Sequence, residues 1–205
     1  MIDFDNNTID LDFFKSIIRE LFADDYDRRE DLLDSFSENQ FKAKSQIINS
    51  LVDLNLLSKT SHVAILGSWY GSILISAISS KVNHIDAYDL DDISNRLSKN
   101  RLYPHLKHKV NWIKGNVFDD IVRSGFDVVI NTSCEHMPPM KDWPHWKPNI
   151  SFAVTSNNMY GIEGHINCVD TIDDFAMQLP LCDILLEDTI SDSRGDRFLI
   201  IGKTK

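Results

Sequence analysis

Short apolar runs separated by polar turns dominate the chain from residue 62 onward. Five of these runs have the length and composition of buried strands: 62–66, 84–88, 110–114, 126–130 and 152–155. Apolar residues at helical spacing, or polar segments of helical length, fall in three further stretches: 72–80, 91–103 and 170–179. Strands that alternate with helices predict βαβ units and a mainly parallel sheet.

The C-terminal part shows a different pattern from the rest of the chain. Two apolar runs, 184–186 and 198–201, are joined by the polar segment Ser191–Asp196. Parallel strands need a long crossover connection, whereas antiparallel strands can be joined by a short turn. We therefore expect an antiparallel hairpin at the end of the chain.

Residues 10–57 carry a helical pattern that is interrupted at 24–27. Before the interruption, apolar residues recur every three or four positions: Leu11, Phe14, Ile17, Ile18 and Leu21. After it, a second helical region contains Leu32, Leu33, Phe36, Phe41, Ile47, Ile48 and Leu51. No linker rich in Pro, Gly or Ser follows. We therefore expect residues 1–58 to form a helical cap on the same domain as an α/β unit of residues 59–205.

Composition narrows the classes of function. The chain has 205 residues, 42% of them hydrophobic, and a net charge of −10, which argues against a general nucleic-acid binder. No apolar run approaches the roughly 18 residues of a membrane span. The N-terminus lacks the basic start and apolar stretch of a signal peptide. The three cysteines are too few for a disulfide framework. These features predict a cytoplasmic protein without a membrane or nucleic-acid partner.

A glycine turn follows the first predicted strand, and an acidic residue follows the second. Gly67 and Gly71 flank the turn, and Asp89 ends the second strand. Glycine lets the backbone pass close to a ligand. A carboxylate after the second strand of such a unit can accept hydrogen bonds from both hydroxyls of a ribose. We therefore expect an adenosine-bearing small molecule at this place.

The order of these elements, the terminal hairpin and three loop motifs resemble the class I S-adenosylmethionine-dependent methyltransferases over about residues 60–203. The motifs are Gly67-Ser68-Trp69-Tyr70-Gly71, Gly115-Asn116 and Asn131-Thr132-Ser133. The chain departs from the family pattern, because Trp69 replaces one glycine and no acidic residue precedes the turn. The resemblance implies an α/β fold: a three-layer Rossmann-like sandwich with a mostly parallel seven-stranded sheet and an antiparallel C-terminal hairpin.

The resemblance also implies S-adenosylmethionine as the cofactor. It places Asp89 on the ribose and Asn116 on the adenine, with the methionine end near the fourth strand. The cofactor-binding residues that it implies are Gly67, Ser68, Trp69, Tyr70, Gly71, Asp89, Leu90, Asn116, Val117, Asn131 and Thr132.

Polar loops after the fourth and fifth strands supply candidates for chemistry and for substrate binding. Asn131, Glu135 and His136 are the predicted catalytic residues, because a transfer to an acceptor needs a group that takes one proton. A loop histidine can instead simply bond a backbone carbonyl. A third polar group lies in the helical cap, at Glu38, Asn39, Gln40, Lys42 and Lys44. The predicted substrate-binding residues are Gln40, Ser156, Asn157, Asn158 and Tyr160.

Two further readings concern metals and aromatic residues. Cys134, His136, His165 and Cys168 invite a zinc site, but no clip such as Cys-x-x-Cys is present, so no metal is expected. Trp69 and Tyr70 lie in the cofactor turn, where aromatic faces stabilise a sulfonium cation. Trp143 and Trp146 lie in a segment rich in proline, and we expect them to hold this loop in place.

The leading hypothesis is an enzyme that transfers the methyl group of S-adenosylmethionine to a small polar molecule. One alternative breaks another bond of the same cofactor by aminocarboxypropyl transfer, cyclisation to azetidine-2-carboxylate or lysis, and releases methylthioadenosine. Another alternative is a non-catalytic, methyltransferase-like binding subunit. A nicotinamide-dependent dehydrogenase fits less well, because the glycines do not follow G-x-G-x-x-G. The acceptor and the oligomeric state are left open.

Overall fold

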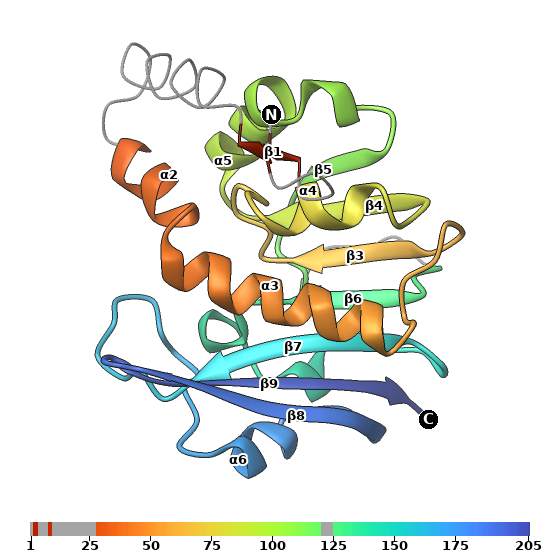
Figure 1. Ribbon diagram of the computed structural model, residues 1–205. Coiled ribbons are helices and arrows are strands. Elements are labelled where there is room, and N and C mark those ends of the chain that lie inside the picture. The colour runs from red at the N-terminus through yellow and green to blue at the C-terminus, as the bar shows by residue number, and fades with distance from the viewer. Residues whose placement is uncertain (1, 4–7, 10–27, 120–124) are drawn as a thin grey trace.

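The central feature of the fold is a seven-stranded sheet in which one strand runs against the others (Figure 1). The computed structural model describes residues 2–3, 8–9, 28–119 and 125–205. The sheet has the order β5-β4-β3-β6-β7-β9-β8. Its strands are β3 (His62–Leu66), β4 (His84–Asp89), β5 (Val110–Lys114), β6 (Val128–Asn131), β7 (Ser151–Asn157), β8 (Cys182–Asp192) and β9 (Gly195–Thr204). β9 runs antiparallel to both of its neighbours, β7 and β8, and every other pairing in this sheet is parallel. A separate pair comprises β1 (Ile2–Asp3) and β2 (Thr8–Ile9).

This architecture confirms the predicted fold class and corrects several element bounds. β3 and β5 have the predicted bounds, and the C-terminal hairpin is antiparallel as expected. β8 and β9 are much longer than the two apolar runs, so that only residues 193–194 lie between them. β7 also continues beyond its apolar part, because its last residues pair with β9 as far as Asn157 opposite Arg197.

The helices are short, with one exception on the N-terminal side. The α-helices are α2 (Arg29–Ser35), α3 (Glu38–Asp53), α4 (Leu74–Ser79), α5 (Asp92–Leu97) and α6 (Ile172–Ala176). A π-helical turn, η2 (Ser98–Leu102), extends α5. Short 3₁₀ turns are η3 (Pro104–Leu106), η4 (Cys134–His136) and η5 (Met140–Asp142). The helical region predicted after residue 27 is divided at Ser37. This residue is the N-cap of α3, and its side chain accepts a hydrogen bond from Gln40 N. The helix predicted around Phe14 lies outside the described residues.

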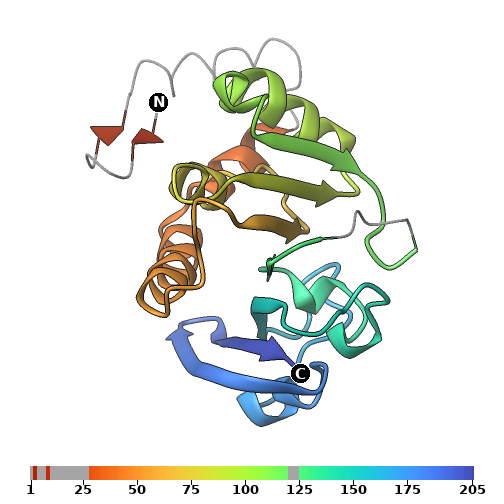
Figure 2. The same cartoon turned by 90° about the vertical axis from the view of Figure 1, so that its right-hand side faces the viewer.

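Two apolar clusters cover the two faces of the sheet and complete three layers (Figure 2). Val63 and Ile65 of β3 belong to a cluster that includes Ile47 and Leu51 of α3. Ala64 and Leu66 belong to the opposite cluster, which includes residues of the segment between β6 and β7. Successive strand residues point to opposite faces, so this alternation follows directly from the pleat. The carboxyl ends of the parallel strands are thereby held at one edge of the sheet.

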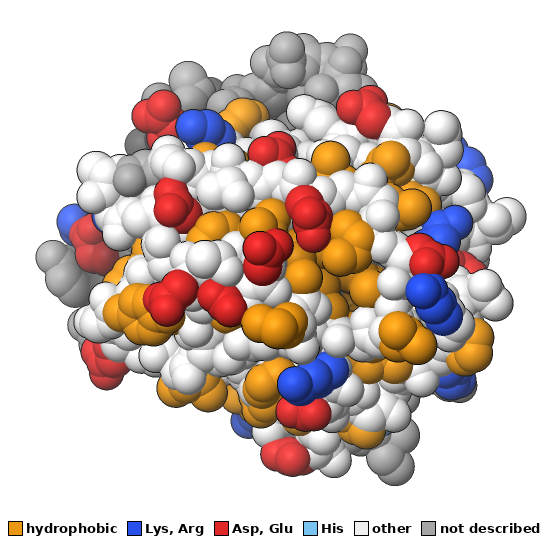
Figure 3. Space-filling view, turned by 90° about the horizontal axis from the view of Figure 1, so that it is seen from below, with side chains coloured by type: hydrophobic (Ala, Val, Ile, Leu, Met, Phe, Trp, Pro, Cys, Tyr) orange, Lys and Arg blue, Asp and Glu red, His pale blue; other side chains and the backbone are white. Residues whose placement is uncertain are grey.

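The outer edge of the sheet, formed by β8, exposes hydrophobic side chains among charged ones. Seen from below, hydrophobic and acidic groups lie next to each other on this side of the molecule (Figure 3). The exposed hydrophobic residues on β8 and just before it are Leu181, Ile184 and Leu185. Asp183, Glu187 and Asp188 lie on the same strand. Charges on an edge strand oppose pairing with the edge of another sheet.

Gly71 is constrained by the packing of α4. It has φ +60, and a Cβ there would lie 2.4 Å from Cδ1 of the fully buried Ile75. Its carbonyl accepts hydrogen bonds from Ile75 N at 3.1 Å and from the Tyr103 hydroxyl at 3.2 Å. That Gly71 is needed for a ligand stays a prediction of the sequence. The structure adds a second constraint, because the backbone turn and the helix that follows it require a glycine here.

Replacing Gly71 by alanine is therefore expected to destabilise the fold. Gly161→Ala is the matched control. Gly161 also has a positive φ, of +82, but a Cβ added there would have no atom within 4 Å. We expect Gly71→Ala to lower the free energy of unfolding by roughly 2–4 kcal/mol, from strain and overpacking together. Gly161→Ala should cost about 1 kcal/mol, from backbone strain alone. Equal losses for the two variants in urea denaturation would contradict the packing argument.

Candidate functional site

A pocket of about 980 Å³ lies at the carboxyl ends of β3, β4, β5 and β6. β3 connects to β4 on one side and has β6 on its other side, so the strand order reverses here. Ligands of open α/β sheets bind at such a switch point. Several predicted site residues line the pocket together: Gln40, Gly67, Trp69, Asp89, Leu90, Asn116, Val117, Thr132, Glu135 and His136.

Asp89 connects the glycine turn to the end of β4. Its Oδ2 accepts a hydrogen bond from Trp69 N at 2.6 Å, and its Oδ1 accepts one from Asp91 N at 2.9 Å. Burial raises the pKa of Asp89, while these backbone hydrogen bonds act in the opposite direction. A carboxylate has about four lone-pair sites, and the backbone N of Leu90 also interacts with it, so at least one site remains for a ligand. Asp89 therefore has both a structural role and unused hydrogen-bonding capacity in the pocket wall.

Trp69 adopts a backbone conformation that normally requires glycine. Its φ is +47, in the left-handed region. The hydrogen bond from Trp69 N to Asp89 holds this conformation, which costs a residue with a side chain on the order of 1–3 kcal/mol. The indole lies against Tyr70, with ring centroids 5.2 Å apart, and forms part of the pocket wall. The backbone of the turn thus has a conformation typical of glycine, although residue 69 is a tryptophan.

At one end of the pocket, an acidic residue and two histidines lie close together. Glu135 is 4% exposed, and its Oε1 lies 3.7 Å from Nη1 of Arg197. A carboxylate oxygen of Glu135 and one ring nitrogen each of His136 and His165 all lie within 4.8 Å of one another. The two imidazole rings are perpendicular, with centroids 4.6 Å apart. These three side chains face the same part of the pocket.

Backbone carbonyls determine the tautomers of both histidines. Nδ1 of His136 lies 2.9 Å from Gly164 O, and Nδ1 of His165 lies 3.0 Å from Met159 O. A carbonyl only accepts, so each Nδ1 donates its hydrogen and each Nε2 carries the lone pair. Burial lowers the pKa of His165, which favours its neutral form. The pair therefore provides proton acceptors at this end of the pocket.

Lys44 and Arg197 add positive charge to the same pocket. Lys44 is 6% exposed, yet it lies on α3 among the buried Ile47, Ile48 and Leu51. Burial and the nearby Arg197 guanidinium lower the pKa of Lys44 to about 8. The sequence indicates Lys44 as a member of the polar group of the helical cap that contains Gln40, but it does not indicate Arg197. A lysine within an apolar stripe of helical spacing is a usable signal for Lys44, whereas β9 offers no comparable signal for Arg197.

The remaining predicted residues lie outside the pocket. Asn131 is fully buried, with Oδ1 accepting from Ser133 N and Nδ2 near the sulfur atoms of Met137 and Met140. Other predicted residues form the turn without lining the pocket, or lie in β7 and after it: Ser68, Tyr70, Gly71, Ser156, Asn157, Asn158 and Tyr160.

The longer β7 explains why the substrate-binding residues predicted after the fifth strand do not line the pocket, although Met159, Glu163 and His165 of the same loop do. Ser156 and Asn157 are strand residues with no exposed surface. Asn158 hydrogen-bonds Asp196, accepting from its backbone N at 2.7 Å. Tyr160 is 60% exposed and donates its hydroxyl hydrogen to Asp170. These side chains serve the β7–β9 pairing and the surface.

The alternative zinc site from the sequence is not assembled among the described residues. Sγ of Cys134 is buried and lies 4.0 Å from Asn131 O, while Cys168 lies beside Nδ1 of His165. Trp143 and Trp146 hold their loop as predicted. Their indole nitrogens donate to Val117 O at 2.9 Å and to Met140 O at 2.6 Å.

No protein-family model and no curated protein matches the sequence. Solved structures do match. N-methyltransferase NodS from Bradyrhizobium japonicum WM9 aligns with 83% of this chain and 98% of its own, at 11% identity and a TM-score of 0.62. An S-adenosylmethionine-dependent methyltransferase from Clostridium acetobutylicum ATCC 824 aligns with 91% of this chain and 98% of its own, at 14% identity and a TM-score of 0.62. TrmK from M. capricolum, in complex with S-adenosyl-homocysteine, aligns with 80% of this chain and 68% of its own, at 12% identity and a TM-score of 0.59.

At these identities the likeness shows the fold. The chain has the Rossmann-like methyltransferase fold, as its sequence predicts. Among the described residues, no helix is both long and apolar enough to cross a membrane.

The low pKa of Lys44 predicts a pH dependence of stability. A lysine whose pKa is lower in the folded than in the unfolded state destabilises the fold while it is charged, and this cost disappears as the pH rises above about 8. Between pH 7 and pH 10, wild type should gain roughly 2–3 kcal/mol of unfolding free energy relative to Lys44→Met. Lys42→Met, at an exposed position of the same helix, retains Lys44 and should therefore have the same pH profile as wild type. Parallel pH profiles for wild type and Lys44→Met would contradict the prediction.

Proposed function

We propose that the protein binds S-adenosylmethionine and transfers its methyl group to a small polar acceptor that carries an anionic group. The observation that carries this proposal is the hydrogen bond between Asp89 and Trp69 N at the wall of the switch-point pocket. It brings the turn after β3 and the carboxylate after β4 to one place. This arrangement suits a ribose whose hydroxyls donate to the carboxylate.

The rest of the pocket supports a nucleoside at this position. Leu90, Val117 and Phe118 offer apolar surface next to Asp89 for an adenine ring. Gly67 and Thr132 follow β3 and β6 and lie where the methionine end would extend. A volume of about 980 Å³ is at the upper end of the range for small-molecule sites, so a cofactor and a small acceptor fit together.

Charge supports an anionic acceptor. Lys44 and Arg197 both line the pocket, and Arg197 pairs with Glu135. Lys44 forms no ion pair with a described residue, and the nearby Asp34 only partly offsets the fall of its pKa. A carboxylate or similar group of the acceptor would compensate Lys44. The net charge of −10 supports a small molecule over a nucleic acid as the partner. We also propose a cytoplasmic location and no membrane partner.

The transfer itself needs alignment and one proton acceptor. The nucleophilic atom of the acceptor attacks the methyl carbon, the carbon–sulfur bond breaks, and S-adenosylhomocysteine leaves. The proton lost by the nucleophile passes to Nε2 of His165 or His136, and Glu135 stabilises the imidazolium that forms. Asn131, being buried, acts only by shaping the turn through Ser133. Gln40 lines the pocket from the cap and is available to the acceptor.

The side chain of Trp69 is a reason to test a second reaction, in which another carbon of the sulfonium is attacked. The indole adds bulk where the family pattern has glycine, so the methionine end meets a wall different from the usual one. Attack on another carbon of the sulfonium would release methylthioadenosine. Incubation with S-adenosylmethionine and a fractionated metabolite pool, followed by mass spectrometry, separates the reactions. S-adenosylhomocysteine supports methyl transfer, methylthioadenosine supports the other reaction, and absence of binding supports a non-catalytic subunit.

Asp89→Asn tests the cofactor site. The substitution removes the charge that strengthens hydrogen bonds to ribose hydroxyls, each worth about 1.5–3 kcal/mol, so affinity should fall at least about tenfold. Calorimetric titration with S-adenosylhomocysteine measures this loss. Asp92→Asn, at an exposed position of α5, is the matched control and should bind as wild type does. Equal affinities for both folded variants would exclude Asp89 from the site.

His136→Asn, His165→Asn and Glu135→Gln test the proton acceptor. Each should lower turnover by about 10²–10⁴-fold if its side chain takes or stabilises the proton. The affinity for S-adenosylhomocysteine should stay within a few-fold, because these groups lie at the acceptor end of the pocket. His105→Asn, at an exposed position, is the control. Full turnover in all three variants, with the metabolite fraction that supports wild-type turnover, would move the chemistry to other residues.

A further inference from the structure

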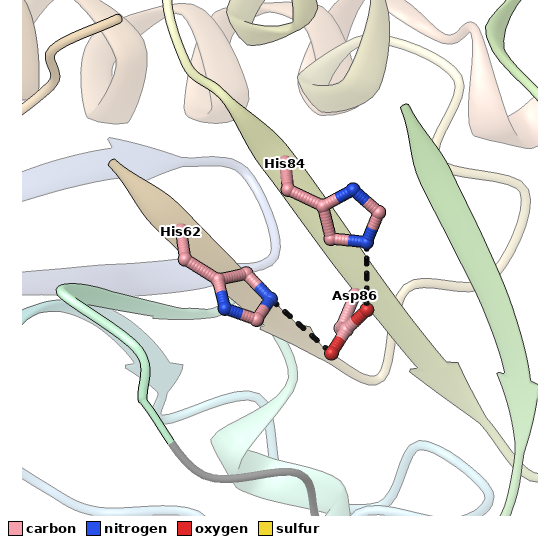
Figure 4. Close-up of side chains that lie close together, drawn as sticks. All are labelled: His62, His84 and Asp86. Atoms are coloured by element: carbon pink, nitrogen blue, oxygen red, sulfur yellow. Dashed lines mark hydrogen bonds and ion pairs between the residues drawn. The ribbon is translucent and has the colours of Figure 1, made fainter. Parts of the chain in front are cut away.

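A second cluster of titratable side chains lies at the end of the sheet opposite the pocket (Figure 4). His62 is the first residue of β3 and His84 the first residue of β4, and the two are partners in the parallel pairing. Asp86 follows His84 by two residues and therefore points to the same face of the sheet. Figure 4 shows both imidazoles directed at the carboxylate of Asp86.

The distances within this cluster resemble those between the ligands of one ion. Nε2 of His62 lies 3.2 Å from Oδ2 of Asp86, and Nε2 of His84 lies 3.2 Å from Oδ1. Zinc binds histidine nitrogens and carboxylate oxygens at about 2.0–2.2 Å in tetrahedral sites, which places neighbouring ligand atoms about 3.3 Å apart. The ligand atoms of the three residues all lie within 4.8 Å of one another.

Hydrogen bonding around the cluster leaves electron pairs directed inward. Nδ2 of Asn111 lies 2.7 Å from both Nε2 of His84 and Oδ1 of Asp86. An amide nitrogen only donates, so Nε2 of His84 accepts from Asn111 and carries a lone pair, and its contact with Oδ1 of Asp86 at 3.2 Å then joins two acceptors. Nε2 of His62 is buried and makes no hydrogen bond within the described residues. Two ring nitrogens in this state beside a fully buried carboxylate favour a cation between them.

The surroundings fix His62 and keep the cluster accessible. The backbone N of His62 donates to Oδ2 of Asp127 at 2.8 Å, and the imidazole packs against Phe126 with centroids 4.9 Å apart. The side chains of His62 and His84 are 25% and 29% exposed, so an ion can enter from solvent. The amide of Asn111 has to rotate away from His84 when the ion binds, and its oxygen or a water can then supply the fourth ligand.

We propose that His62, His84 and Asp86 form a zinc-binding site that links β3 to β4. Two imidazole nitrogens and one carboxylate oxygen are a ligand set that suits Zn²⁺ and disfavours the hard ions Mg²⁺ and Ca²⁺. The site lies at the amino ends of the strands, whereas the proposed cofactor and acceptor lie at their carboxyl ends. Its role is therefore structural, and it is independent of the proposed transferase function.

Zinc titration of metal-free protein tests the site. We expect wild type to bind one Zn²⁺ per chain in calorimetry, to melt at a higher temperature with ZnCl₂, and to be unaffected by MgCl₂. Co²⁺ in place of Zn²⁺ should give the visible absorption of a tetrahedral nitrogen–oxygen site. His62→Gln and His84→Gln should weaken zinc binding at least about tenfold and abolish this spectrum. Glutamine keeps a side chain that can donate to Asp86, so these variants are expected to fold.

Two controls locate the ion. His108→Gln, at an exposed position, should bind zinc as wild type does. His165→Gln removes a histidine of the other cluster, in the pocket, and should also retain the zinc-dependent rise in melting temperature. The proposal is overturned if wild type binds no zinc, which would leave His62, His84 and Asp86 as an ion-pair cluster. It is equally overturned if binding is lost in His165→Gln and unchanged in His62→Gln and His84→Gln.

Discussion

The hydrogen bond from Trp69 N to the carboxylate of Asp89 is the interaction on which the pocket depends. It joins the turn after one strand to the end of the next strand, and so fixes the two walls between which a ligand would lie. It also holds Trp69 at positive φ, a conformation that glycine adopts without strain and tryptophan does not. Trp69 thus adopts a backbone geometry for which glycine is ordinarily needed, and the carboxylate of Asp89 holds its N–H.

Three charged side chains of the pocket differ in the partners that surround them. Asp89 is partly buried and accepts hydrogen bonds from backbone amides, Glu135 is buried next to Arg197, and Lys44 is buried without an ion pair to a described residue. The pKa of Lys44 falls to about 8 because burial and the Arg197 guanidinium outweigh the attraction of the nearby Asp34. An anion bound beside Lys44 would stabilise its charged form, and the anionic acceptor that we propose would therefore lie near α3.

The sequence predicted the parallel core of the fold well, because apolar runs such as 62–66 and 110–114 report burial on both faces of a sheet. It predicted the extent of β7 poorly, since Ser156 and Asn157 are polar. They remain in the strand because β9, about 40 residues later in the chain, supplies hydrogen-bond partners. Local pattern contains no information about such a distant pairing. The same limit applies to the histidine pair of the pocket. The sequence indicates both His136 and His165, and groups them with two cysteines as a possible zinc site, but only the fold shows that the loop after β7 brings His165 against His136 and Glu135.

The two ends of β3 and β4 are connected through their register. His62 pairs with His84 at one end of the strands and Leu66 pairs with Tyr88 at the other, immediately before Gly67 and Asp89. A slip of one residue would turn every side chain of a strand to the opposite face. Such a slip would move Asp89 away from the turn and the histidine of β4 away from its partner at once. A cation shared by His62, His84 and Asp86 would therefore stabilise, at the far end of the same strands, the geometry that places Asp89 against Trp69.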